Sequence, residues 1–296
     1  MKLYPFITVD VFTEQRFGGN QLAVFFNAEG LTAEQMHSLA AEFNLSETTF
    51  VLPPEKPGNT ARVRIFTRTA EMPFAGHPTV GTAYVLAQQG RDKDGELLFE
   101  VPAGLVKVKV ERDAAGKPVG ALVAAPQPLT VGEEFPVEAI AACAGLEASD
   151  IITTYHKPVL ASVGTRFVIA EVGDEALKNA TPNIEPFRRL SAECPHLEGR
   201  VSLHLYTRLS EGKLRARMFA PLSGTWEDPA TGSANAPLAA LLLSLSDKSH
   251  HALEVMQGVE MKRPSLLNLT ATRGEDGIRA TVGGRCVPVL RGEAMV

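Results

Sequence analysis

Most apolar residues of the sequence stand in short runs that alternate with polar positions or end at glycine and proline, the pattern of β-strands. A different pattern at residues 32–43 predicts a helix, with Thr32 and Gln35 at the spacing of a capping box. A second short helix is expected at residues 139–144, ending at Gly145. Strands are predicted over residues 7–12, 22–26, 47–52, 62–67, 105–110, 201–206 and 214–219.

Two further segments, residues 78–89 and 229–245, are helical candidates that carry small or apolar side chains nearly all round. A helix without a polar face belongs in the interior of a protein. Each is expected to form the centre of a wrapped sheet, one in each half of the chain. The pattern therefore predicts an α+β fold.

The two halves also resemble each other. Residues 77–83 (HPTVGTA) align with residues 228–234 (DPATGSA) at an offset of 228 − 77 = 151. Upstream, residues 62–66 (RVRIF) align with residues 215–219 (RARMF) at an offset of 215 − 62 = 153. The repeat predicts two similar domains, residues 1–125 and residues 126–296, with the last strand able to return to the first domain.

The aligned helix starts carry polar residues. Proline is favoured in the first turn of a helix, so the preceding residues, His77 and Asp228, are expected to be the N-caps. Gly81 and Gly232 would then fall in the first turns, beside free backbone N–H groups that attract anions, and Ser233 would add a hydroxyl. Two such starts facing each other across a cleft between the domains would hold a small carboxylate. Each capping residue, taken alone, also has an ordinary structural interpretation.

Composition and charge exclude several classes of protein. The 296 residues are 45% hydrophobic and 21% charged, with a net charge of −5, and no run rich in Lys or Arg suggests nucleic acid or an acidic membrane as partner. The longest apolar run, residues 237–245, is shorter than the roughly 20 residues that a membrane-spanning helix needs. No signal-peptide pattern opens the sequence, and a cytoplasmic protein is expected.

No cofactor or metal motif stands out. The sequence contains no G-x-G-x-x-G, P-loop or H-E-x-x-H pattern, and the pair His250-His251 has no acidic or cysteine partner nearby. Cys143, Cys194 and Cys286 lie far apart, without the spacing of a zinc site. We expect neither a metal nor a cofactor.

Four motifs resemble those of the PhzF-like (phenazine biosynthesis) isomerase family: residues 17–20 (FGGN), 46–50 (SETTF), 74–79 (FAGHPT) and 227–233 (EDPATGS). The resemblance continues through residues 257–258, 263–265 and 282–284 and covers essentially the whole chain. The family is similar to diaminopimelate epimerase and proline racemase. It implies two domains, each a β-barrel-like mixed sheet wrapped around a central α-helix, with the site between them.

The resemblance also implies a site and a reaction. Glu47 matches the acid/base carboxylate of the S-E-T motif, and His77, Asp228 and Ser233 match the other catalytic positions. The reaction would be a cofactor-free proton shift on a small carboxylate-bearing metabolite, for which trans-2,3-dihydro-3-hydroxyanthranilate is one candidate. A homodimer is expected from the resemblance alone. The substrate-binding positions that it implies are Asn20, Gly76, Thr231 and Gly232.

Two differences from related sequences bear on the chemistry. The family's G-N-P is Gly19-Asn20-Gln21 here, so the loop that carries Asn20 need not keep the family geometry. The related racemases place a thiol at each helix start, whereas this sequence has His77 and Asp228 there, which disfavours a two-thiol racemase. A racemase or epimerase that uses Glu47 and His77 stays open, as does a carboxylate-binding protein without catalysis.

Overall fold

The computed structural model describes all residues 1–296, and the chain divides into two compact units. Unit 1 comprises Met1–Ala124 and Val282–Val296, and unit 2 comprises Ala125–Thr281. No helix of the chain is both long enough and apolar enough to cross a membrane.

Unit 1 is a closed barrel. Its strands pair in the circular order β1–β2–β3–β4–β6–β7–β8–β18, and β18 returns to β1. Only β2–β3 and β4–β6 are parallel, because a helical crossover lies between the members of each of these pairs. The elements are β1 (Leu3–Val11), β2 (Asn20–Phe25), α1 (Ala33–Phe43), β3 (Glu47–Leu52), β4 (Ala61–Phe66), β5 (Glu71–Met72), α2 (Gly76–Gln88), β6 (Glu96–Val101), β7 (Gly104–Arg112), β8 (Pro118–Ala124) and β18 (Gly277–Met295).

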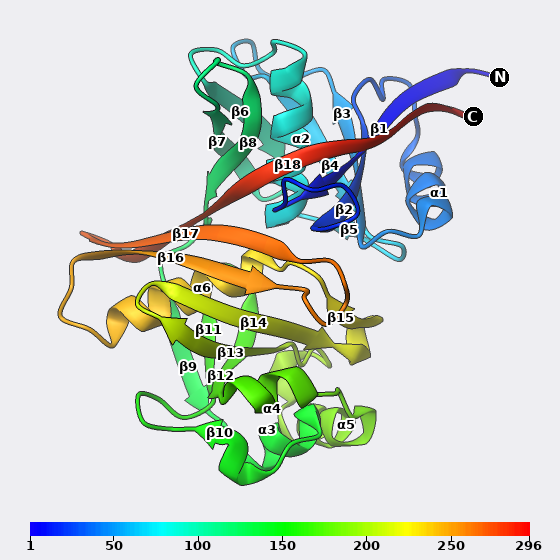
Figure 1. The fold of residues 1–296 in the computed structure, drawn as a ribbon. Coiled ribbons are helices and arrows are strands. Elements are labelled where there is room, and N and C mark those ends of the chain that lie inside the picture. The colour runs from blue at the N-terminus through cyan, green and yellow to red at the C-terminus, as the bar shows by residue number, and fades with distance from the viewer. The chain divides into compact units, whose positions relative to one another are not determined.

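Helix α2 fills the barrel of unit 1 (Figure 1). Every residue from Gly76 to Ala87 is buried, and the helix packs against β1, β2, β3, β7 and β8. A Cβ atom on Gly81 would lie 2.6 Å from Leu22 Cδ2 and 2.8 Å from Val11 Cγ2, so only glycine allows this close approach to the wall. The prediction of a buried apolar helix is confirmed.

Helix α1 also agrees with the sequence pattern. Thr32 Oγ1 accepts a hydrogen bond from the Gln35 backbone N–H, and Gln35 Oε1 accepts one from the Thr32 backbone N–H, which completes the predicted capping box. Asn44, in the left-handed region at φ 52°, ends the helix. The buried face, with Met36 and Ala40, packs on an aromatic cluster that includes Phe25 and Phe50.

Unit 2 has a similar order and direction of strands around a central helix. Its order β11–β12–β13–β14–β16–β17 is again parallel only at β12–β13 and β14–β16, where helices form the crossovers. The central α6 packs against β11, β12, β16 and β17. The elements are β9 (Thr130–Glu134), α3 (Val137–Ala144), η1 (Ala148–Asp150), β10 (Ile151–Ile152), β11 (Val159–Ser162), β12 (Arg166–Val172), α4 (Asp174–Asn179), α5 (Ile184–Glu193), η2 (Pro195–Leu197), β13 (Leu203–Ser210), β14 (Lys213–Ala220), η3 (Pro221–Ser223), β15 (Thr225–Asp228), α6 (Gly232–Ser244), β16 (His250–Gln257) and β17 (Ser265–Gly274).

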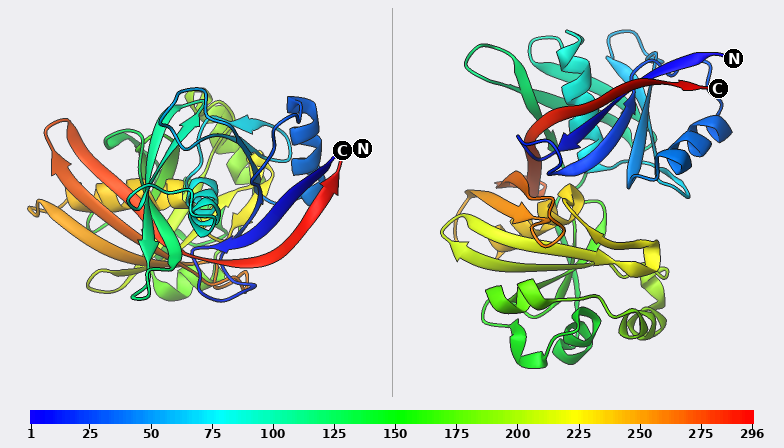
Figure 2. Two further views of the ribbon diagram at one scale, coloured as in Figure 1. Left: turned by 90° about the horizontal axis from the view of Figure 1, so that it is seen from above. Right: turned by 45° about the vertical axis from the view of Figure 1, so that its right-hand side comes forward.

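The last strand, β18, begins in unit 2 and ends in unit 1. Its final part pairs antiparallel with β1, from Val11 beside Cys286 to Leu3 beside Met295. The backbone N–H of Lys2 donates to the carbonyl of Val296 at 2.8 Å, so the two ends of the chain lie side by side, as both views in Figure 2 show.

The predicted N-caps are wrong. Ala75 caps α2, so His77 is its second residue, and Thr231 caps α6, so Asp228 lies at the end of β15. Asp228 is held as a strand residue by its pairing with Met218. The error arose because proline is tolerated at several positions before and within a first turn, so it does not mark one start.

The glycines at the two helix starts also need correction. Gly232 is the first residue of α6, but Gly81 is the sixth residue of α2, outside its first turn. The first residue of α2 is Gly76, so the two helices begin 232 − 76 = 156 residues apart. The other predicted pair, Arg62 and Arg215, lies on the equivalent strands β4 and β14.

Candidate active site

Unit 1 brings Glu47 and His77 together. Glu47 is the first residue of β3 and is half-buried, while His77 lies in the first turn of α2 and is buried. Glu47 Oε2 and His77 Nε2 are 3.4 Å apart, and Nε2 forms no hydrogen bond. The carboxylate and the imidazole thus share one location at the N-terminal end of the central helix.

The buried surroundings of the His77 imidazole favour its uncharged form at neutral pH. Burial lowers its pKa to about 3, although a hydrogen bond with the backbone of Gln21 acts in the opposite direction. Because Nε2 has no hydrogen-bond partner, this bond must involve Nδ1, which donates its proton to the Gln21 carbonyl. Nε2 therefore presents a lone pair toward Glu47 and can accept a proton that the carboxyl group carries.

The Gln21 position differs from the family motif without loss of this contact. His77 bonds to the main chain of Gln21, and a proline there would offer the same carbonyl. The neighbouring Asn20 is buried at the start of β2, where Ser46 Oγ donates to Asn20 Oδ1 at 3.1 Å. Ser46 precedes Glu47, so this bond fixes the β2 start beside the carboxylate-bearing strand.

The N-terminus of α2 is open to an anion. Its N-cap, Ala75, makes no side-chain hydrogen bond, and the first bond of the helix runs from Thr79 N to Ala75 O at 3.2 Å. The amides of Gly76 and His77 precede that bond, at the positive end of the helix dipole. This end of the helix favours a negative charge near His77.

The acid dependence of stability tests the protonation of His77. An unfolded chain binds this proton below pH 6.5, whereas the folded chain excludes it down to about pH 3, so stability is lost as the pH falls through that window. From pH 7 to pH 5 we expect a loss of about 2 kcal/mol from this residue. Urea unfolding at both pH values should show a pH-dependent loss that is about 2 kcal/mol smaller in His77→Gln than in the wild type, because the buried His204, whose pKa is also lowered, contributes equally in both proteins. Exposed His250→Gln should behave as wild type; equal pH dependence in His77→Gln would refute the assignment.

Unit 2 gathers the residues of the second motif at the start of α6. Thr231 Oγ1 donates to Asp228 Oδ2 at 2.5 Å, and both residues are buried. Gly232 and Ser233 are the first two residues of the helix, and no side chain caps it. The motif thus places three kinds of group at the start of α6: the Asp228 carboxylate, which Thr231 orients, the Ser233 hydroxyl, and backbone N–H groups that no side chain caps.

Buried polar side chains below this turn are functional candidates that sequence reasoning missed. Gln257 Nε2 donates to Asp228 O at 2.8 Å and to Thr231 Oγ1 at 3.1 Å. Gln257 Oε1 accepts from Thr231 N at 3.2 Å and from Asn235 Nδ2 at 2.8 Å. Asn235 Oδ1 lies 3.2 Å from Nε2 of His204, whose pKa burial lowers to about 4. Only Gln257 stood in a recognisable motif.

Replacing Gln257 with leucine tests this support. The variant leaves Asp228 O and Thr231 N in the interior without their partner, and we expect the free energy of unfolding to fall by about 1–3 kcal/mol. Urea unfolding at pH 7 measures it. Met256→Leu, on the same strand, is the control and should lose less than about 1.5 kcal/mol. A Gln257→Leu variant as stable as that control would contradict the support role.

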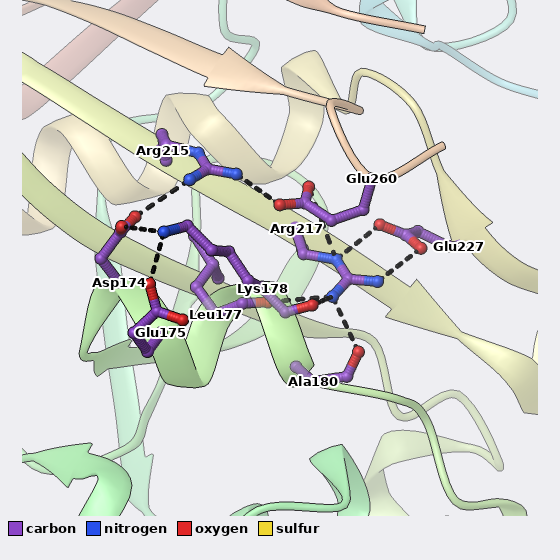
Figure 3. A network of polar contacts seen from close by, with 9 residues as sticks. All are labelled: Asp174, Glu175, Leu177, Lys178, Ala180, Arg215, Arg217, Glu227 and Glu260. Atoms are coloured by element: carbon purple, nitrogen blue, oxygen red, sulfur yellow. Dashed lines mark hydrogen bonds and ion pairs between the residues drawn. The ribbon is translucent and has the colours of Figure 1, made fainter. Parts of the chain in front are cut away.

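A charged network holds the strand that carries Asp228 (Figure 3). Arg217 is 6% exposed and binds Glu227 with both ends of its guanidinium, at 2.8 and 2.9 Å. Its Nη1 also donates to the carbonyls of Leu177, Lys178 and Ala180 at the end of α4. Arg217, on β14, therefore links β15 to the end of α4. Its partner on β15, Glu227, stands one residue before Asp228.

The cysteines have no place in either cluster. All three are free, and burial raises the pKa of the Cys143 thiol to about 12 and also raises that of Cys286. A thiol that resists ionisation is a poor base and nucleophile. No group of three or more histidine, cysteine, aspartate or glutamate side chains comes together in the chain as a metal site would require.

Comparison with known proteins agrees with these motifs. The family model described as "Phenazine biosynthesis-like protein" matches residues 9–292. A trans-2,3-dihydro-3-hydroxyanthranilate isomerase of Pseudomonas aeruginosa is 35% identical over 297 residues, covering 99% of each chain. An uncharacterized isomerase of Mesorhizobium japonicum is 36% identical over 305 residues, covering the whole of both chains.

Solved structures show the same fold. A phenazine biosynthesis protein of the PhzF family from Bacillus anthracis superposes with a TM-score of 0.88 at 26% identity, covering 100% of each chain. A hydroxyproline epimerase from Agrobacterium vitis shares the fold alone, with a TM-score of 0.62 at 16% identity over 98% of this chain and 92% of that one. The chain is therefore an isomerase-type enzyme that belongs to the phenazine biosynthesis-like, or PhzF, family.

Proposed function

We propose that this enzyme shifts a proton between two carbons of a small carboxylate-bearing metabolite, with Glu47 as the general acid/base. The observation that carries the proposal is the approach of Glu47 Oε2 to Nε2 of the buried His77, 3.4 Å away, where Nε2 has no hydrogen-bond partner. Once the Glu47 carboxyl group has gained a proton, Nε2 of His77 lies close enough to accept it. One carboxylate can then take up a proton and give it back.

In the proposed reaction, the carboxylate of Glu47 removes a proton from an acidic carbon. The electrons of that C–H bond pass into the conjugated system of the substrate, and the amides at the start of α2 stabilise the negative charge that develops. The carboxyl group then delivers a proton to a different carbon. Atoms and electrons balance within the substrate and Glu47, so this step needs no oxidant or cofactor.

We assign the motif residues of unit 2 to the positioning of the substrate. The amide of Gly232 and the hydroxyl of Ser233 suit a substrate carboxylate, and Asp228 suits an amine or hydroxyl donor. Thr231 and Gln257 hold Asp228 and its turn in place. Asn20 is proposed to contact substrate from unit 1.

The first substrate to test is trans-2,3-dihydro-3-hydroxyanthranilate, because the relative of that name from Pseudomonas aeruginosa is 35% identical over nearly the full length. Proton NMR in deuterium oxide would follow its conversion and the carbons that exchange hydrogen. Conversion with exchange supports the proposal for this substrate. Binding without conversion, also visible as thermal stabilisation, would favour a different carboxylate or a non-catalytic role.

A racemase or epimerase that uses Glu47 and His77 as two bases is the second candidate. In such an enzyme one of the two groups must hold a proton while the other does not. The lowered pKa of His77, about 3, disfavours an imidazolium acid at neutral pH. Inversion of a stereocentre without migration of a double bond would overturn this preference. The homodimer and the cytoplasmic location stay predictions.

A further inference from the structure

Unit 1 has a pocket at the end of α2 opposite His77. It encloses about 690 Å³, within the roughly 300–1,000 Å³ that is usual for small-molecule sites. Tyr84 and Val85 of α2, Ile7 of β1 and Val287 of β18 contribute its apolar surface. Tyr84 stands seven residues after His77, or about 10 Å along the helix, so this pocket is separate from the Glu47 cluster.

The rim of this pocket is basic although the chain is acidic. Four cationic and two anionic side chains line it, a net charge of 4 − 2 = +2, against −5 for the whole chain. Glu14 is neutralised by its ion pair with Arg285. Asp113 Oδ1 accepts the backbone N–H groups of Ala115 and Lys117, at 3.0 and 2.9 Å. Both anions are thus engaged within the protein.

Three cations are left for a ligand. Arg16 uses its Nε to donate to Pro288 O at 2.8 Å, which leaves its two terminal nitrogens available. The side chains of Lys117 and Arg291 make no hydrogen bond or ion pair. Arg16 lines the pocket together with Tyr84, the hydroxyl of which has a pKa raised by burial.

The Asp113 carboxylate and the end of the helix both oppose an anion at this rim. The C-terminal end of a helix carries partial negative charge, which repels an anion. In α2, the carbonyls of Leu86 and Ala87 accept hydrogen bonds from Gln89 N and Gly90 N, at 3.1 and 2.9 Å, which reduces that repulsion. The three available cations outnumber the Asp113 carboxylate, so the net charge at the pocket rim is positive.

We propose that this pocket, the basic pocket, binds a small amphipathic anion: an aromatic or medium-chain alkyl carboxylate or sulfonate. The apolar body lies against Tyr84 and Val287, and the anionic group lies among Arg16, Lys117 and Arg291. Apolar burial supplies most of the affinity, and the cations select an anion over a neutral molecule of the same shape. The inference does not rest on the proposed function.

Fluorescence titration with 8-anilinonaphthalene-1-sulfonate tests the proposal. One site per chain is expected, with displacement by decanoate and much weaker displacement by decan-1-ol. Arg16→Ser/Arg291→Ser should weaken binding about fivefold. The matched control, Arg189→Ser/Arg200→Ser, removes two exposed arginines of unit 2 and the same net charge. It should bind as wild type.

A third variant tests the pocket by filling it, so its result does not depend on the charge of the rim. Val119→Trp places a bulky ring in the pocket from β8 and should abolish one-site binding, with circular dichroism to verify folding. Binding that survives Val119→Trp, equal weakening in the two double variants, or equal displacement by decanoate and decan-1-ol would each overturn the proposal. So would the absence of binding to the wild type.

Discussion

Replacement of Glu47 with glutamine is expected to lower kcat by about 10²–10⁴-fold, the usual contribution of a positioned general acid/base. The amide has the shape of the carboxyl group but cannot accept and return a proton at neutral pH. Substrate contacts elsewhere are unchanged, so the dissociation constant should change little. Initial rates and equilibrium binding, measured on trans-2,3-dihydro-3-hydroxyanthranilate or another confirmed substrate, separate the two quantities.

The matched control for this variant is Glu42→Gln, an exposed carboxylate on α1. It removes the same charge from unit 1 and should retain wild-type turnover. If Glu47→Gln loses affinity in proportion to its loss of kcat, Glu47 acts by binding the substrate and not by moving a proton. Unchanged kcat would remove Glu47 from the chemistry altogether.

Replacement of Arg217 with methionine is expected to lower the free energy of unfolding by about 3–5 kcal/mol, because it leaves a buried charge without its partner. Glu227 has 11% of its side chain exposed, and three carbonyls at the end of α4 would lose their donor as well. Urea denaturation at pH 7 measures the change. Exposed Arg189→Met on α5 should stay within about 0.5 kcal/mol of wild type.

A double variant separates the ion pair from the rest of the Arg217 contacts. Arg217→Met/Glu227→Met removes both charges, so it should be more stable than Arg217→Met alone. It should also retain a measurable defect, because the carbonyls of Leu177 and Ala180 stay without a donor. A single variant that loses less than about 1 kcal/mol would show that Arg217 does not hold the β15 end.

Local sequence signals predicted the elements that depend on local rules. The capping box of α1 and the glycine end of α3 follow from side-chain chemistry within one turn. The buried positions of α2 and α6 follow from the lack of a polar face. The repeat predicted two related units, because equivalent central helices need similar small and apolar residues.

Long-range pairing was not predictable from the same signals. Residues 277–295 form one continuous strand although Gly283 and Gly284 interrupt the apolar pattern. These glycines permit close approach to β8: a Cβ on Gly283 would lie 2.8 Å from Ala121 O, and one on Gly120 would lie 2.2 Å from Gly284 O. Glycine here serves packing between strands and not a turn, which only the three-dimensional structure distinguishes.

The candidate site was predictable in residue type but not in protonation. The motifs indicated Glu47 and His77 through family resemblance, since residues 30 positions apart give no local evidence of contact. Whether Nε2 of His77 can accept a proton depends on the burial of the ring and on its hydrogen bond to the Gln21 backbone. Neither can be read from a motif. His204 and Asn235 were missed for the same reason, because they interact only across the interior of unit 2.

Hydrogen exchange of bound substrate in deuterium oxide tests the role of Glu47 most directly. Proton NMR measures the rate at which the acidic C–H signal disappears. The wild type and Glu47→Gln are compared with the same fraction of each protein bound to substrate. We expect exchange or transfer of that hydrogen in the wild type and none above the uncatalysed rate in the variant. Equal loss of the signal with both proteins would contradict it.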